Sequence, residues 1–194
     1  MHKTMMAVAR GMAMVGGAVL SLLIVLTCIS IAGRSLNGIL HSDFMMSVAP
    51  GLARWLIDLG IGPVNGDFEL VEAGVAFAIF AFIPLCQITS GHASVDIVAN
   101  ALPRGVNRFL RMVIEVTFAA VLVLIAWRLY AGMISKQSYG ETSFLLQFPV
   151  WWAYAASLFA AVVAAIVGVY MGAVRTYEFF TGRILIWDGV EVEQ

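Results

Sequence analysis

The sequence predicts an all-α integral membrane protein whose 194 residues form a single domain of four transmembrane helices. Hydrophobic residues make up 61% of the chain and charged residues only 12%, with a mean hydropathy of +0.93. A soluble core of ordinary proportions cannot bury that much apolar surface. Four long apolar stretches cover residues 11–33, 70–88, 112–134 and 150–174. Each has about the 17–25 residues with which a helix crosses a bilayer core of roughly 30 Å, so lipid is the expected surrounding.

The positions of Lys and Arg predict that both termini lie in the cytoplasm. Four spans place the two termini on one side of the membrane, and that side holds seven basic residues outside the spans: Lys3, Arg10, Arg104, Arg108, Arg111, Arg175 and Arg183. The other side holds three: Arg34, Arg54 and Lys136. Because cytoplasmic segments carry the excess of Lys and Arg, the loop 34–68 is predicted to be periplasmic and the tail 175–194 cytoplasmic. No basic stripe exists, so nucleic acid is not an expected partner.

The first apolar stretch has a second interpretation, as a secretory signal. Lys3 and Arg10 precede it, and Ser30-Ile31-Ala32 loosely resembles a small-residue cleavage site. The stretch is roughly twice as long as the apolar region of a signal peptide, which favours a retained span.

The loop 34–68 contains an amphipathic pattern. Leu52, Trp55, Leu56 and Leu59 recur at i, i+3, i+4 and i+7, with polar residues on the other face. This pattern predicts a helix, started by Pro50, that lies flat on the outer membrane surface with Trp55 at the level of the headgroups. The alternative is a loop packed over the outer end of the bundle.

The third and fourth spans carry further structural signals. A helix from Pro103 to the end of the third span has 32 residues, or about 48 Å, so it should tilt or project into the cytoplasm. Trp151 and Trp152 open the fourth span as interfacial anchors. Small residues then repeat every four positions along it, and this ridge predicts a face for close helix packing: Ala156, Ala160, Ala164, Gly168 and Gly172.

Charged side chains lie only near the ends of the spans. Glu69, Glu72 and Arg128 cluster toward the outer end. Antiparallel neighbours would bring Glu72 and Arg128 to similar depth, which predicts an ion pair that Arg34 could join, the alternative being that each side chain reaches water independently. At the inner end, Arg111 and Glu115 are spaced i, i+4 and are expected to satisfy each other. A protein that transports alone needs polar groups near the bilayer midplane, and these spans have almost none.

Catalytic, cofactor and metal chemistry find no support in the sequence. The histidines, His2, His41 and His92, fall outside the four stretches, so haem between spans is not expected. No CxxC, HExxH or Gly-rich phosphate loop occurs. Cys28 and Cys86 lie at different depths, which excludes a disulfide between them. The sequence therefore predicts neither an enzyme nor a cofactor or metal site.

Residues 66–103, GDFELVEAGVAFAIFAFIPLCQITSGHASVDIVANALP, resemble the small membrane subunit of tripartite ATP-independent periplasmic (TRAP) transporters. The most telling parts are Glu69-Leu70, the segment 90–96 (SGHASVD) and Leu102-Pro103. The segment 148–152, FPVWW, also looks like the family's usual start of the fourth helix. The resemblance covers the four-span layout and most of the chain from Gly66 to Tyr177. Where the family often has a basic residue before its Gly-His pair, this chain has Thr89-Ser90.

The resemblance implies a scaffold subunit that lacks the transport site. Its implied partners are a large multi-span membrane subunit and a periplasmic substrate-binding protein, in the bacterial inner membrane. Members of the family take up organic acids, driven by an ion gradient that is usually sodium. Gly91, His92 and Asp96 at the exit of the second span either cap a turn or contact the partner.

Two alternative hypotheses, which assign the chain to other functional classes, stay open at this point. One is a self-contained small carrier or channel that works as an oligomer, for which Glu72, Glu115 and Arg128 would have to face a common pore. The other is an anchor subunit of another membrane complex, with no transport role.

Overall fold

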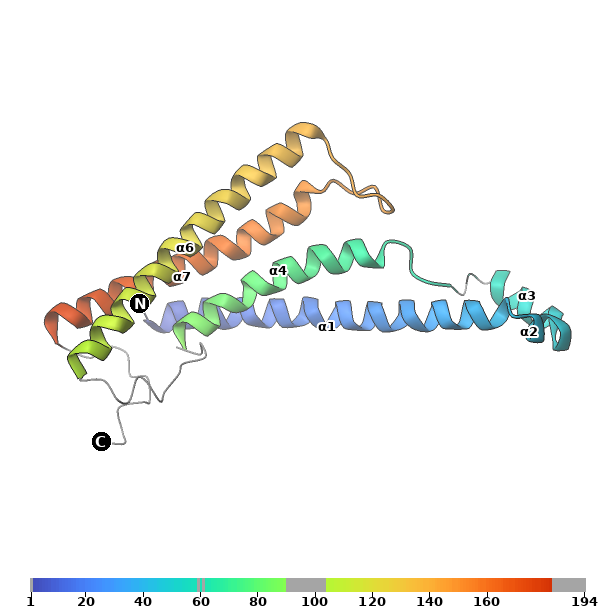
Figure 1. Ribbon diagram of the computed structural model, residues 1–194, viewed down its shortest axis with the longest axis horizontal. Coiled ribbons are helices and arrows are strands. Elements are labelled where there is room, and N and C mark those ends of the chain that lie inside the picture. The colour runs from blue at the N-terminus through green and yellow to red at the C-terminus, as the bar shows by residue number, and fades with distance from the viewer. Residues whose placement is uncertain (1, 59, 61, 90–103, 183–194) are drawn as a thin grey trace.

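The named secondary-structure elements of the described part of the chain are all α-helices, with no β-strand among them. The computed structural model in Figure 1 describes residues 2–58, 60, 62–89 and 104–182. The helices are α1 (His2–Leu40), α2 (Asp43–Val48), α3 (Pro50–Asp58), α4 (Asp67–Ile88), α6 (Arg104–Tyr139) and α7 (Trp151–Thr181). Four of them, α1, α4, α6 and α7, are long and apolar enough to cross a membrane. The predicted fold class, an all-α protein with four transmembrane helices, is confirmed.

The long helices continue beyond the apolar stretches that predicted them. α1 has 39 residues and α6 has 36, which at 1.5 Å per residue gives lengths of roughly 58 and 54 Å. Hydropathy marks only the part of a helix that lipid can cover, whereas backbone hydrogen bonding continues until a capping or turn residue ends it. The spans predicted at 11–33 and 112–134 are therefore the central parts of longer helices.

The four spans form two antiparallel pairs, α1 with α4 and α6 with α7, and α4 packs on α7 to join them. In Figure 1 the pairs lie together at the end that holds the N-terminus and diverge toward the start of α4. Half of the apolar segment of α7 is buried, against 11% of that of α1. α7 is thus the central helix, and α1 presents most of its surface to its surroundings.

Small residues allow these close helix contacts. A Cβ added at Gly16 of α1 would lie 2.8 Å from the Cβ of Ala81 in α4. On α7, a Cβ at Gly168 would lie 2.9 Å from a methyl group of Leu122, and one at Gly172 would lie 3.5 Å from the carbonyl oxygen of Glu115. Backbones can approach this closely only where side chains are small, which is how helices associate in lipid.

The short helices α2 and α3 lie at the far end of α1, away from α6 and α7 (Figure 1). α3 begins at Pro50 and contacts α1 and α2. Ala53 is its buried residue, while Trp55 is 61% exposed. A helix therefore occupies the segment where the amphipathic pattern was found, and its position on the membrane surface stays a prediction.

Candidate functional site

Charged side chains in the described spans lie at the two ends of the bundle. We call the end at the start of α4 and α7 the outer end, and the opposite end the inner end, following the predicted topology. Residues 11–33, 73–88, 116–127 and 151–174 contain no Asp, Glu, Lys, Arg or His. The middle of the bundle therefore has no ionisable side chain of these types with which to replace the hydration of an ion or an acid.

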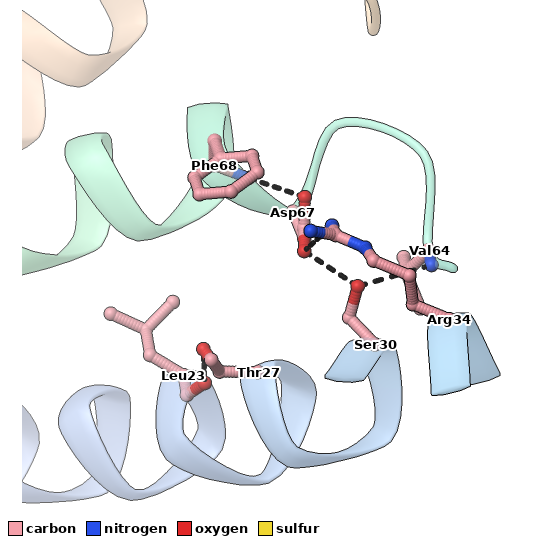
Figure 2. Close-up of polar contacts among 7 residues, drawn as sticks. All are labelled: Leu23, Thr27, Ser30, Arg34, Val64, Asp67 and Phe68. Carbon is pink, nitrogen blue, oxygen red and sulfur yellow. Dashed lines mark hydrogen bonds and ion pairs between the residues drawn. The ribbon is translucent and has the colours of Figure 1, made fainter. Parts of the chain in front are cut away.

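A polar cluster at the outer end ties α1 to the start of α4 (Figure 2). The hydroxyl of Ser30 donates to Asp67 Oδ2 at 2.5 Å and accepts from the backbone N–H of Val64 at 3.3 Å. The other carboxylate oxygen of Asp67 accepts from the N–H of Phe68 at 2.9 Å. Arg34 approaches Asp67 at 3.7 Å, and its guanidinium lies 5.7 Å from the centre of the Phe68 ring. Ser30 and Asp67 are buried, so this cluster fixes where α4 begins against α1.

Asp67 occupies the first turn of α4, where backbone N–H groups have no partner in the helix and a negative charge is favoured. The residue before it, Gly66, has a φ of 78°, a left-handed conformation that glycine adopts without strain. Ser30 and Arg34 are spaced i, i+4 on α1, so both face Asp67. Neither Ser30 nor Asp67 was predicted as a site residue. The sequence signals that could have revealed the cluster are the acidic residue that follows Gly66 and the two polar residues spaced i, i+4 on α1.

The predicted ion pair between Glu72 and Arg128 is wrong. Both side chains are exposed, and neither belongs to an ion pair in the described part of the chain. The physical reason is that α7 packs against both α4 and α6, which keeps the outer parts of those two helices apart. Arg34, expected to join that pair, contacts Asp67 instead.

Glu69 holds the loop between α6 and α7. Its two carboxylate oxygens accept hydrogen bonds from the backbone N–H groups of Leu145, at 2.6 Å, and Leu146, at 2.9 Å. A Cβ added at Gly66 would collide with the side chain of Leu146, so the loop lies directly against the start of α4. Glu69 thus joins the two helix pairs at the end where they diverge.

A second set of polar side chains, at the inner end, is buried among α4, α6 and α7. The side-chain amide of Gln87 donates to the carboxylate of Glu115, and the two residues are 0% and 8% exposed. Arg175 and Glu178 form an ion pair at 2.8 Å with side chains 7% and 8% exposed. The i, i+4 spacing predicted that Glu115 pairs with Arg111 on its own helix, and Gln87 was assigned no role, since no local spacing reveals a partner on another helix. The expected pairing of Arg111 with Glu115 stays a prediction.

The remaining predicted residues have the following positions. Ala164, Gly168 and Gly172 are buried on α7, and the two glycines face α6. Ala156, the first residue of the small-residue ridge, is exposed. Trp55 on α3 is exposed. Gly91, His92 and Asp96 lie outside the described residues.

The described clusters are suited to holding helices together. In residues 2–58, 60, 62–89 and 104–182, no three His, Cys, Asp or Glu side chains gather closely enough to hold a metal ion. The Ser30–Asp67 and Gln87–Glu115 hydrogen bonds each join two different helices. Such bonds satisfy polar groups that would otherwise be costly to place beside lipid.

Comparison with known proteins identifies a family for this chain. Residues 23–176 match the family model described as tripartite ATP-independent periplasmic transporters, DctQ component. No curated protein and no solved structure matches the chain. The matched region covers all of α4 and α6, most of α7 and the part of α1 from Leu23 onward. This chain belongs to the DctQ family, the small membrane component of TRAP transporters.

Proposed function

We propose that this chain is the scaffold subunit of a TRAP transporter, which binds and stabilises the large membrane subunit. The large subunit would carry out ion-gradient-driven uptake of an organic acid that a periplasmic binding protein delivers. The observation that carries the proposal is the absence of Asp, Glu, Lys, Arg and His from the middle of all four spans. A subunit of this construction offers a solute no polar path, so its contribution to transport is to hold another protein.

The distribution of buried surface supports a scaffold role. Only 11%, 28% and 22% of the apolar segments of α1, α4 and α6 are buried within the chain. These three helices leave most of their apolar surface for lipid or for another membrane protein. The central helix α7 and its small-residue contacts fix the positions of the other spans.

Co-purification tests the partner. The full chain, carrying an affinity tag, is co-expressed with the large subunit and purified in mild detergent. We expect a stable complex in which the two proteins are present in equal amounts. A large subunit that is equally abundant and equally stable without this chain would contradict the scaffold role.

Uptake by reconstituted vesicles tests whether the large subunit, and not this chain, carries out transport. Three preparations are compared: this chain alone, the large subunit alone, and both together, each with the binding protein and an imposed sodium gradient. We expect uptake only where the large subunit is present, and more uptake when this chain accompanies it. Accumulation of solute by vesicles that hold this chain alone would instead support a self-contained carrier.

We further propose that the chain lies in the bacterial inner membrane with both termini in the cytoplasm. The excess of Lys and Arg at the inner end supports this orientation. Single cysteines at Ser138, beyond the outer end, and Thr181, at the end of α7, are introduced into a chain whose Cys28 and Cys86 are replaced by Ala. A membrane-impermeant maleimide added to spheroplasts should label the cysteine at 138 and spare the one at 181. The reverse labelling would contradict the orientation.

The segment containing Gly91, His92 and Asp96 is a proposed contact with the partner. Support comes from the family resemblance of this segment. His92→Ala is compared with His41→Ala, a change at an exposed histidine in the periplasmic loop. We expect His92→Ala to reduce co-purification of the large subunit and uptake, and His41→Ala to change neither. Wild-type behaviour of the His92 variant in both assays would remove the motif from the interface.

A further inference from the structure

The loop between α6 and α7 is a small hairpin, residues 141–150, with a fixed shape. Thr142 and Pro149 form an antiparallel bridge. The N–H of Ser143 donates to the carbonyl of Phe148 at 2.9 Å, and the N–H of Val150 donates to the carbonyl of Glu141 at 3.0 Å. These two cross-links leave residues 144–147 as the tip of the hairpin, which reaches toward the start of α4 in Figure 1.

The tip is held by further contacts. Gln147 has a φ of 56°, which is uncommon for a residue other than glycine. Its side-chain amide donates to the carbonyl of Phe144 at 2.8 Å, and its amide oxygen accepts from the hydroxyl of Thr142 at 3.2 Å. Glu69 binds the next two backbone N–H groups, those of Leu145 and Leu146. The backbone of the tip is therefore ordered before any partner arrives.

This ordered tip exposes three apolar side chains in succession. Phe144 is 87% exposed, Leu145 57% and Leu146 39%. Ordering a loop normally costs free energy on binding, and a loop that is already ordered avoids that cost. Aromatic residues that enter a partner's pocket contribute a large share of binding energy. A strained and hydrogen-bonded hairpin that presents apolar side chains to its surroundings, with Phe144 the most exposed, has the properties of a binding element.

We propose that the tip of the 141–150 hairpin, with Phe144 as its anchor, docks into an apolar pocket at the outer edge of the large membrane subunit. This inference rests on the proposed function. The tip carries no charge, and the one ion pair of the hairpin, Lys136 with Glu141, is internal to the chain. Permanent interfaces are more apolar than those of partners that bind and leave, which favours a resident membrane subunit over a binding protein that must dissociate after delivery. Anchoring in lipid would need apolar side chains but no fixed backbone.

Photo-crosslinking in membranes identifies the occupant. The full chain carries Phe144→p-benzoylphenylalanine and is expressed with the complete transporter, and the crosslinked species are identified by mass spectrometry. The matched control is Phe44→p-benzoylphenylalanine, since Phe44 is 75% exposed on α2 at the other side of the outer end. We expect the probe at 144 to capture the multi-span subunit with several times the yield of the probe at 44. Capture of lipid alone, capture of the binding protein alone, or a yield no higher than the control's would overturn the inference.

Substitutions measure the strength of the contact. Phe144→Ala should weaken the affinity of the chain for the large subunit at least about tenfold, whereas Phe44→Ala should not. Glu69→Ala releases the tip and should also weaken affinity, while Glu72→Ala, three residues further along α4, should leave it unchanged. Thermal unfolding of each purified variant checks the fold. Because Phe144 is so exposed, its Ala variant should unfold at the same temperature as the wild type. Wild-type affinity of the Phe144 variant would overturn this inference alone, whereas failure of the wild-type chain to bind any large subunit would overturn the proposed function.

Discussion

The inner and outer ends of the bundle hold their helices together by different means. At the inner end, three helices meet through small residues and through buried polar side chains such as Gln87 and Glu115. At the outer end, the α1–α4 and α6–α7 pairs diverge, and the 141–150 hairpin joins them through Glu69. The outer contacts are hydrogen bonds made partly in reach of water, whereas the inner contacts combine steric fit with burial.

This difference predicts different tolerance to mutation. Close-packed contacts tolerate little added volume, because neighbouring backbones cannot move apart without losing other contacts. Hydrogen bonds near water are each worth less, because water competes for the same groups. The inner end should therefore behave as the rigid joint of the subunit, and the outer end as the part that a partner can adjust.

The largest expected effect is steric and lies in the inner half of the α1–α4 contact. Gly16→Leu should lower stability by about 2–3 kcal/mol, because even a Cβ there would lie 2.8 Å from the Cβ of Ala81. Gly17→Leu is the control, since a Cβ at Gly17 meets nothing within 4 Å. Thermal unfolding in detergent measures both. Equal stability of the two variants would mean that this helix contact does not control stability.

A smaller effect is expected from the polar contact between α4 and α6. Gln87→Leu removes a buried donor to Glu115 and should cost about 1–3 kcal/mol, because the carboxylate loses a partner where water does not reach it. Gln137→Leu, at an exposed position on α6, should cost much less. Chemical denaturation of both purified variants makes the comparison. If Gln137→Leu lowered stability as much as Gln87→Leu, the contact between Gln87 and Glu115 would contribute nothing specific to stability.

At the outer end, removal of one hydroxyl should cost about 1 kcal/mol. Ser30→Ala deletes the group that links Asp67 and the N–H of Val64, whereas Ser21→Ala deletes a hydroxyl that bonds only to a carbonyl of its own helix. We expect the unfolding midpoint of the Ser30 variant to be lower than that of the wild type, and the midpoint of the Ser21 variant to be unchanged. Hydrogen exchange of the amides at the start of α4 should also accelerate in the Ser30 variant, and unchanged exchange there would contradict the proposed tie.

The smallest effect concerns Glu72 and Arg128. Because both are exposed and unpaired with each other, Glu72→Ala and Arg128→Ala should have effects that add within about 0.5 kcal/mol in the double variant. Unfolding of the two single variants and the double variant forms the cycle. A larger coupling energy would mean that the outer ends of α4 and α6 approach each other, and the contrast between the two ends would weaken.

Particular residues show which parts of the site the sequence could reveal. The positions of Glu69 and Glu72 near the outer end followed from hydropathy, and so did the inner position of Glu115. The partners did not follow. Glu69 binds the N–H groups of Leu145 and Leu146, which are 76 and 77 residues away in the chain. Arg128, the predicted partner of Glu72, lies on α6, which α7 separates from α4.

The sequence by itself determined the class of the protein, the four spans and the end of its span near which each charged side chain of the spans lies. These depend on transfer from water to lipid, which each segment undergoes largely independently of the others. The tertiary structure alone decided which face of each helix meets a neighbour, how far helices extend past the apolar stretches, and which polar groups meet. The physical reason is that rotation about a helix axis and the choice of neighbour depend on the fit between small residues on different helices, such as Gly16 with Ala81 or Gly168 with Leu122, and no local sequence pattern specifies that fit.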